Sequence, residues 1–244
     1  MVNSGRKADT TNVWVKCDYF VSIFGQTKAT TRSKPMTSTE QAYNLWAAQY
    51  DTNINRTRDL EAKALRSVLG DFQNLDILEI GCGTGKNSEW LITKAKSLLG
   101  VDLSANMLNF ARLKVIQSTA CFIEADIQQA WDFTTDRFDL ITFSLVLEHI
   151  GDLDFIFTQA NQKLKPGGLV YVGELHPFKQ YSGTKARFDT ENGRTTLECF
   201  THHVSDFTKA AQRKGFAIQH LEEWFDEDDR SGTPRILTLL LRKM

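Results

Sequence analysis

The sequence lacks several features that would point to particular classes of protein. It has four cysteines, which lie far apart and form no close pair with the spacing of metal ligands: Cys17, Cys82, Cys121 and Cys199. We therefore expect reduced thiols rather than a zinc site, and no metal. The formal net charge is −1, which argues against a protein that binds nucleic acid through its overall charge, although a local basic patch would escape this measure.

Long hydrophobic runs are also missing. The longest, such as Ile236 to Leu241, are far shorter than a membrane span, and Met1 to Lys7 has no apolar core of a signal peptide. We therefore expect a soluble cytoplasmic protein without a membrane span. The 244 residues with 41% hydrophobic content suffice for a full core. They predict one domain at 39–244, preceded by an N-terminal arm and linker at 1–38, in which Val13 to Phe24 fits a strand or a helix equally well.

Strands and helices alternate through the middle of the chain. Short apolar runs typical of buried parallel strands occur at 75–80, 98–102, 121–124, 138–143 and 169–173. Segments with helical spacing separate them, and Ser104 and Asp152 are predicted to begin two of these helices as N-caps. This alternation predicts right-handed crossover units that build a parallel sheet, that is, an α/β fold.

Further segments precede and follow the alternating strands and helices. Two helices, from Ser38 or Thr39 to about Tyr50 and from Thr57 to Leu69, are expected to form an N-terminal cap at 39–70. After the fifth strand, Glu174 to Val204 shows no clear helix, but Asn192-Gly193 suggests a hairpin. Because insertions after a central strand lie over the active side of such a sheet, we expect 174–204 to cover a substrate. Ser205 is predicted to cap a last helix, which two final strands follow.

A glycine-rich turn follows the first strand, where residues 81 to 85 read Gly-Cys-Gly-Thr-Gly. Glycine lets the backbone turn sharply and leaves no side chain between it and a ligand. The start of the next helix can hold an anionic group. The turn is not the dinucleotide fingerprint, because Lys86 occupies the position of that pattern's last glycine. A nucleotide-cofactor oxidoreductase is therefore the less favoured alternative.

The G-x-G-x-G spacing resembles the first motif of class I S-adenosylmethionine-dependent methyltransferases. Four further landmarks agree in order and spacing: Asp102 after the second strand, Asp126-Ile127 after the third, Ser144 to His149 after the fourth, and Leu164 to Gly168 before the fifth. The resemblance covers roughly Thr39 to Gly173. It implies a Rossmann-like, seven-stranded, mostly parallel sheet with an antiparallel last strand and helices on both faces. It also implies S-adenosylmethionine as cofactor and S-adenosylhomocysteine as product.

The resemblance further assigns roles around the cofactor. Asp102 would accept hydrogen bonds from the ribose hydroxyls, and Asp126 from the adenine amino group. Leu103, Met107 and Ile127 would enclose the adenine ring. Either acid could instead be a helix cap or an exposed strand end. The full set of expected cofactor-binding residues is Glu79, Gly81, Cys82, Gly83, Gly85, Asn87, Asp102, Leu103, Met107, Asp126, Ile127, Ser144 and Tyr50.

Two elements are expected at the acceptor end. Tyr43, Trp46, Tyr50 and Asp51 resemble the Tyr-Asp element of the ubiquinone/menaquinone-type subgroup, which forms part of a lid, although an ordinary amphipathic helix explains them equally well. His149 and His176 follow the fourth and fifth strands and are candidates for a catalytic base, with a structural hydrogen bond or a turn before Pro177 as alternatives. Expected substrate-binding residues are Tyr43, Trp46, Glu148, Glu174, Phe178, Tyr181 and His203; only one of His202 and His203 can point inward.

We therefore predict a methyltransferase that moves a methyl group to an oxygen, nitrogen or carbon atom of a small-molecule acceptor by in-line displacement. A non-catalytic binding or scaffold subunit on the same fold is the alternative. No nucleic-acid partner is expected, and the sequence leaves monomer and homodimer open. The acidic run Asp226 to Asp229 predicts a solvated hairpin loop or, less favoured, a contact with a cationic substrate or partner.

Overall fold

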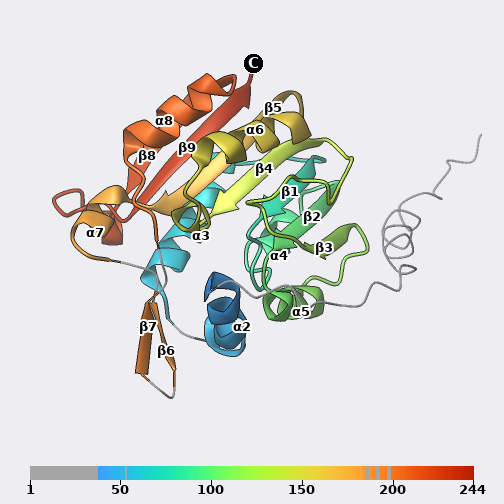
Figure 1. The fold of residues 1–244 in the computed structure, drawn as a ribbon. Helices are drawn as coiled ribbons and strands as arrows, with labels where there is room; N and C mark the ends of the chain where they lie inside the picture. Colours follow the sequence, from blue (N-terminus) through green and yellow to red (C-terminus); the bar gives the residue numbers. More distant parts are fainter. Residues whose placement is uncertain (1–37, 53, 185–186, 191–192, 197–198) are drawn as a thin grey trace, which may run out of the picture. The chain divides into compact units, whose positions relative to one another are not determined.

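The computed structural model describes residues 38–52, 54–184, 187–190, 193–196 and 199–244 (Figure 1). The chain divides into two compact units, residues 1–35 and 36–244, and the described residues belong to the second. The expected N-terminal arm, with the segment from Val13 to Phe24, therefore lies outside the described residues. The division into arm, cap and methyltransferase domain stays a prediction.

A seven-stranded sheet forms the centre of the described unit. Its strands are β1 Asp76–Ile80, β2 Ser97–Asp102, β3 Ala120–Glu124, β4 Phe138–Ser144, β5 Leu164–Leu175, β8 Phe216–Trp224 and β9 Ile236–Lys243. They lie side by side in the order β3-β2-β1-β4-β5-β9-β8. Neighbours from β3 to β5 pair in parallel, whereas β9 is antiparallel to both β5 and β8. The predicted α/β sheet with an antiparallel last strand is confirmed.

Helices cover both faces of this sheet, as Figure 1 shows. They are α2 Ser38–Tyr50, α3 Arg56–Leu69, α4 Ser88–Leu91, α5 Ala105–Lys114, α6 Leu153–Lys163, α7 Pro177–Tyr181 and α8 Val204–Arg213, with short 3-10 turns η1 Leu147–His149 and η2 Asp226–Asp228. On one face, Phe157 of α6 and Phe207 of α8 belong to the same buried cluster as Leu78 and Ile80 of β1. On the other, α3, α4 and α5 bury their apolar sides against a second cluster that contains Ile77. Because β1 contributes to both clusters, it lies in the middle of the core.

The predicted caps show how well local signals fix helix starts. Ser104 Oγ accepts the Met107 amide at 3.1 Å, and Asp152 Oδ1 accepts the Phe155 amide at 3.0 Å. The prediction for α8 is wrong by two residues, because His203 rather than Ser205 is the N-cap. The Asp206 carboxylate accepts the His203 amide at 2.8 Å, and this bond starts the helix earlier than the sequence pattern suggests.

The insertion after β5 differs in part from expectation. A short helix, α7, begins at Pro177, with the His176 ring nitrogen accepting the Phe178 amide at 3.2 Å. The predicted hairpin is confirmed: β6 Arg187–Thr190 pairs antiparallel with β7 Gly193–Thr196, outside the main sheet. The expectation of no helix in this segment is therefore wrong, because a histidine cap was not a signal in the sequence reading.

Three smaller features complete the fold. β5 begins at Leu164 rather than Leu169, because Leu164 pairs with Phe138 before a register irregularity. In the acidic run, Asp226 is bound by Arg235 through two hydrogen bonds, of 2.6 and 2.5 Å, so its carboxylate is not free for a partner. No helix in the described part of the chain is long and apolar enough to cross a membrane.

Candidate functional site

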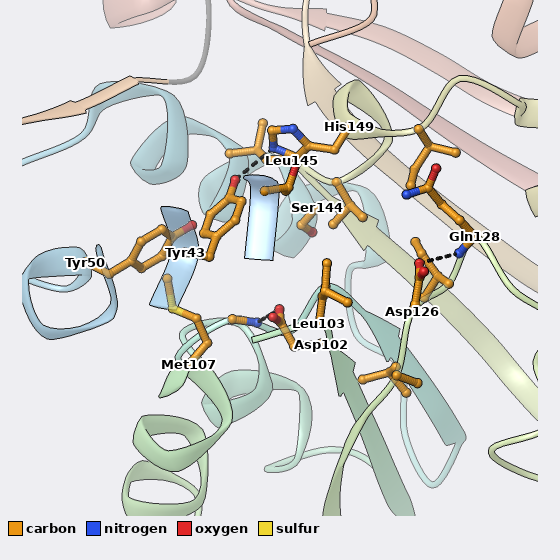
Figure 2. A pocket seen from close by; sticks show the side chains of 18 residues that line it. Tyr43, Tyr50, Asp102, Leu103, Met107, Asp126, Gln128, Ser144, Leu145 and His149 are labelled. Carbon is orange, nitrogen blue, oxygen red and sulfur yellow. Dashed lines mark hydrogen bonds between the residues drawn. The ribbon is translucent and has the colours of Figure 1, made fainter. Parts of the chain in front are cut away.

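A cavity of about 810 Å³ opens at the carboxyl ends of the central strands (Figure 2). It lies where β1 pairs with β2 on one side and β4 on the other, the position at which open α/β sheets bind ligands. Its lining residues are Thr39, Tyr43, Tyr50, Gly81, Gly83, Val101, Asp102, Leu103, Met107, Ala125, Asp126, Ile127, Gln128, Ser144, Leu145, Val146, His149 and Ile150. Nine of the thirteen expected cofactor residues are in this set; Glu79, Cys82, Gly85 and Asn87 are not.

Asp102 is the best-fixed charged group in the cavity wall. Its Oδ2 accepts the Gly83 amide at 2.8 Å and its Oδ1 accepts the Ser104 amide at 2.9 Å. The carboxylate therefore ties the glycine turn to the start of α5. Burial raises the pKa of Asp102, while the backbone bonds from Ser104 and Gly83 act in the opposite direction. Since each carboxylate oxygen has two acceptor positions, both can still accept a hydrogen bond from a ligand hydroxyl.

Two glycines of the turn serve different purposes. Gly81 has φ +68° and Gly83 has φ +54°, a conformation that side chains rarely adopt. A Cβ on Gly81 would come within 2.2 Å of Val146 Cγ2, so packing requires a glycine there. A Cβ on Gly83 would meet no atom within 4 Å, and Gly83 lines the cavity. The space that a side chain at Gly83 would fill therefore belongs to the cavity and is open to a ligand.

Buried acids hold the glycine turn from the interior of the protein. Glu79 accepts a hydrogen bond from Ser88 Oγ, and burial raises the pKa of Glu79 to about 8. Asn87 Nδ2 donates to Glu61 at 3.1 Å, and burial raises the pKa of Glu61 to about 7. The structure thus brings Glu79 and Asn87 to the turn but turns their side chains into the protein, where they hold the turn and do not line the cavity.

The opposite wall is formed after β2 and β3. Leu103, Met107 and Ile127 provide apolar surface, and Met107 is 1% exposed. Asp126 Oδ1 accepts the Gln128 amide at 3.0 Å, which fixes the loop after β3. Figure 2 shows Asp126 and Asp102 on adjoining sides of the apolar surface around Leu103. The wall therefore offers two acidic groups with apolar surface between them.

Helix α2 closes a further side of the cavity. Tyr43 and Tyr50 line it, whereas Trp46 packs behind them, with its ring centroid 4.8 Å from that of Tyr50. After the helix, Asp51 accepts hydrogen bonds from Thr84 Oγ1 and from Lys114 Nζ, both at 2.7 Å. These bonds fasten the end of α2 to the glycine turn and to the end of α5.

His149 and Tyr43 meet at the remaining end of the cavity. The Tyr43 hydroxyl lies 2.8 Å from His149 Nε2, and Figure 2 shows the two side chains pointing toward each other. Burial raises the pKa of Tyr43 well above its ordinary value, so the hydroxyl stays protonated, and it donates to Nε2 or accepts from Nε2–H according to the imidazole tautomer. Glu148 Oε1 lies 3.9 Å from the same nitrogen. A polar group that can exchange protons thus stands at this end.

The second expected base, His176, lies elsewhere. It is 1% exposed, and its Nε2 is 2.9 Å from Glu223 Oε1 on β8. Burial lowers the pKa of His176, and the Glu223 carboxylate opposes that shift. The His176 amide donates a hydrogen bond to the Arg235 carbonyl at 2.8 Å. Because this bond holds the chain beside the start of β9, His176 stays next to β8 and β9. His176 is not brought together with the residues of the cavity.

Most of the expected substrate residues also lie outside the cavity. Phe178 and Tyr181 are 51% and 54% exposed on α7, and the Tyr181 hydroxyl lies 2.5 Å from His203 Nδ1. Glu148 and Glu174 line a smaller neighbouring cavity. His202, rather than the expected His203, lines this cavity with them. Of the expected substrate residues, only Tyr43 lines the large cavity.

Sequence reasoning missed several lining residues, of which Leu145 is the most unusual. It has φ +58°, and its amide donates to Gly173 at 2.8 Å. A non-glycine residue in this conformation costs about 1–3 kcal/mol and is often found at functional sites. Val146 and Ile150 follow on the same loop, and Thr39, Val101, Ala125 and Gln128 complete the missed set. The one available signal was their position directly at a strand end or at the start of α2.

Metal ligands do not gather in the described residues: no three side chains of His, Cys, Asp or Glu are placed so that they could hold an ion. The cavity wall itself offers carboxylates, hydroxyls, backbone groups and one imidazole.

The comparisons with known proteins agree with this geometry. Residues 78–172 match the family model described as a methyltransferase domain. A ubiquinone biosynthesis O-methyltransferase of Chelativorans sp. is 34% identical over 106 residues, or 43% of this chain and 42% of the relative. An uncharacterized methyltransferase of Emericella nidulans is 28% identical over 218 residues, 74% of this chain and 76% of the relative. The chain thus spans less than half the length of the Chelativorans relative.

A solved structure gives the same result in three dimensions. The S-adenosylmethionine dependent methyltransferase of Mesorhizobium loti superimposes with a TM-score of 0.62 at 27% identity, covering 76% of this chain and 100% of that one. Sequence match, strand order and cavity position agree, and the cofactor of such proteins is S-adenosylmethionine. Residues 78–172 therefore match a methyltransferase domain, and the described fold is that of S-adenosylmethionine-dependent methyltransferases.

Proposed function

We propose that this chain transfers a methyl group from S-adenosylmethionine to a small-molecule acceptor. The observation that carries the proposal is the Asp102 carboxylate, which lines the large cavity and is held by the Gly83 and Ser104 amides. S-Adenosylmethionine supplies an electrophilic methyl group on a sulfonium centre. The protein then has to bind the cofactor, align the acceptor and exclude water.

The cavity residues fit this cofactor. Asp102 has free acceptor positions for two ribose hydroxyls, and the space at Gly83 admits a ligand close to the backbone of the turn. Asp126 would accept from the adenine amino group, with Leu103, Met107 and Ile127 against the ring.

At the acceptor end we propose His149 as base and Tyr43 as the residue that positions it. The 2.8 Å contact between Tyr43 and His149 Nε2 fixes the orientation of the imidazole. When Nε2–H donates to the Tyr43 oxygen, Nδ1 of the neutral imidazole is the nitrogen that can take the proton that an acceptor hydroxyl or amine loses as it is methylated. Helix α2, fastened through Asp51, excludes water from the same place.

A small acceptor is favoured over a polymer by the enclosure of this end. Thr39 and Tyr43 of α2 and Ile150 after η1 line the cavity there. None of the described lining residues is Lys or Arg, so the wall offers no cation for a phosphate backbone. The near-neutral net charge of −1 agrees with this argument.

The acceptor class can be tested by measuring S-adenosylhomocysteine formation. Purified protein with S-adenosylmethionine would be offered a panel of phenols, amines and carboxylic acids, and separately tRNA and a denatured polypeptide. We expect product with one or more small molecules and none with the polymers. Product with a polymer alone would contradict the small-molecule proposal. Cofactor binding without turnover on any acceptor would favour the non-catalytic alternative.

A matched pair of glycine substitutions tests the cofactor position. Gly83→Ala and Gly70→Ala place a Cβ at φ +54° and +59°, and neither Cβ meets an atom within 4 Å. Both variants place a side chain at positive φ, at a cost of about 1–3 kcal/mol each, and the melting temperature of each variant is measured to show that it remains folded. Only Gly83 lines the cavity, so only Gly83→Ala should weaken S-adenosylhomocysteine binding, by about tenfold or more in calorimetry. Equal affinities in both variants would place the cofactor elsewhere.

A further inference from the structure

A second cavity adjoins η1, since Glu148 of η1 lines it and His149 of η1 lines the large cavity. Its volume is about 170 Å³, and it is lined by Glu148, Glu174, Leu175, Gln180, Phe200, His202 and Phe207. Glu148 and Glu174 are 8% and 2% exposed. A cavity this small with two buried acids is suited to one compact polar group.

This cavity is built by a segment that fastens onto the η1 loop. The Phe200 amide donates to the Glu148 carbonyl at 2.7 Å, and His202 Nε2 lies 2.7 Å from the Ile150 carbonyl. The Phe200 ring lies over Gly151, where a Cβ would come within 3.2 Å of the ring. Residues 200 to 202 therefore form a fixed wall rather than a loose loop above the acids.

Both acids keep one oxygen without a partner. Glu174 Oε1 accepts the Val146 amide at 2.9 Å and the Leu147 amide at 2.8 Å, which fixes the carboxylate. Its Oε2, like Oε2 of Glu148, is buried and accepts no hydrogen bond from the described residues. A buried acceptor without a donor costs about 1–3 kcal/mol. A ligand that carries N–H groups would remove this cost at both residues.

The acids also stand next to the proposed acceptor end. Glu148 Oε1 is 3.9 Å from His149 Nε2, and His149 lines the large cavity. Burial raises the pKa of Glu148 to about 7 and, together with the nearby Glu148 charge, that of Glu174 to about 8. Burial thus disfavours the charged form of both acids, and a bound cation would stabilise that form. Because no three metal-binding side chains gather in the described residues, an organic ammonium fits this pair better than a metal ion.

We propose that Glu148 and Glu174 form a subsite for a protonated amine of the acceptor, separate from the atom that is methylated. The proposal rests on the proposed function, because it takes the His149 end as the place of methyl transfer. An ammonium has three N–H donors, enough to reach the free Oε2 of each glutamate. The substrate class is then an amine-bearing small molecule that reaches from His149 past η1 into the second cavity.

Three probes share a phenol with a two-carbon side chain and end in an ammonium, in no polar group or in a carboxylate: tyramine, 4-ethylphenol and 3-(4-hydroxyphenyl)propionate. Each would be titrated by calorimetry at millimolar concentration into protein saturated with S-adenosylhomocysteine, in the presence of EDTA. We expect tyramine to bind at least tenfold more tightly than 4-ethylphenol, and the propionate most weakly. Glu148→Gln and Glu174→Gln each keep the shape of the side chain, and Glu174→Gln also keeps an acceptor oxygen for the Val146 and Leu147 amides. Both substitutions should remove the preference for tyramine over 4-ethylphenol.

Glu223→Gln is the matched control, since Glu223 is an acid on β8 that contacts His176 and lines neither cavity. It should keep the full preference for tyramine. Three results would overturn the subsite: no preference or no tyramine binding in the wild type, a preference that survives both glutamine substitutions, or one that appears only with added Mg²⁺. Binding of S-adenosylhomocysteine is read in the same samples. Its failure in the wild type would contradict the proposed function, whereas intact binding without an amine preference would overturn the subsite alone.

Discussion

Replacing Asp102 with alanine is expected to weaken S-adenosylhomocysteine binding by roughly 100-fold or more. The substitution removes the proposed acceptor of two ribose hydroxyls. It also leaves the Gly83 and Ser104 amides without the carboxylate that holds them, so the glycine turn loses its anchor. The loss in affinity should therefore exceed that from a single hydrogen bond, and calorimetry on folded protein would measure it.

Asp139→Ala is the matched control for this prediction. Asp139 also accepts a backbone amide, from Asp76 at 2.9 Å, and a second donor, Lys165 Nζ, at 2.7 Å. It is the second residue of β4, at the amino end of this strand and away from the cavity at the carboxyl end, so its loss should affect stability without changing affinity. Asp102→Asn, which preserves the shape of the side chain, separates charge from folding. An unchanged dissociation constant in both Asp102 variants would refute the ribose assignment.

Replacing His149 with alanine is expected to lower turnover by about 10²- to 10⁴-fold, the usual contribution of a general base. The affinity for S-adenosylhomocysteine should change little, because the proposed cofactor contacts lie at Asp102, Asp126 and the glycine turn. Tyr43→Phe should lower turnover less, because it removes the bond that orients the imidazole but leaves the base. Initial rates would be measured with the acceptor that the small-molecule panel identifies.

His220→Ala provides the control for the histidine prediction. His220 lies on β8, is exposed, and contacts Glu222 at 3.0 Å, so its loss should leave turnover unchanged. Turnover that also survives His149→Ala would show that positioning alone is sufficient. In that case the imidazole would be a structural partner of Tyr43, and the acceptor would reach the site already deprotonated or would lose its proton to solvent.

The sequence predicts the parts of this protein that depend on local pattern. Strands of buried apolar residues between amphipathic helices allow few topologies, because crossover connections are right-handed. The Ser104 and Asp152 caps depend on bonds within three residues, so their signals are local too. The same is true of the glycine turn, whose spacing indicates a ligand site before any tertiary contact is known.

The residues that sequence reasoning misplaced depend on long-range contacts. Glu79 faces Ser88 and Asn87 faces Glu61, so a position beside the glycine turn does not determine which way the side chain points. His176 remains paired with the β8–β9 edge through Arg235, a contact that only the antiparallel last strand creates. The small cavity needs residues 200 to 202 to return to η1, and no periodicity predicts that return.

Titration of S-adenosylhomocysteine into the wild-type protein, with NAD as the comparison ligand, tests the central claim most directly. One S-adenosylhomocysteine per chain should bind in the Asp102 cavity with micromolar affinity and raise the melting temperature of the protein. NAD should neither bind nor raise the melting temperature. Folded protein that gives no heat and no thermal shift with S-adenosylhomocysteine, or that responds to NAD instead, would contradict the assignment of this cavity to the methyl donor.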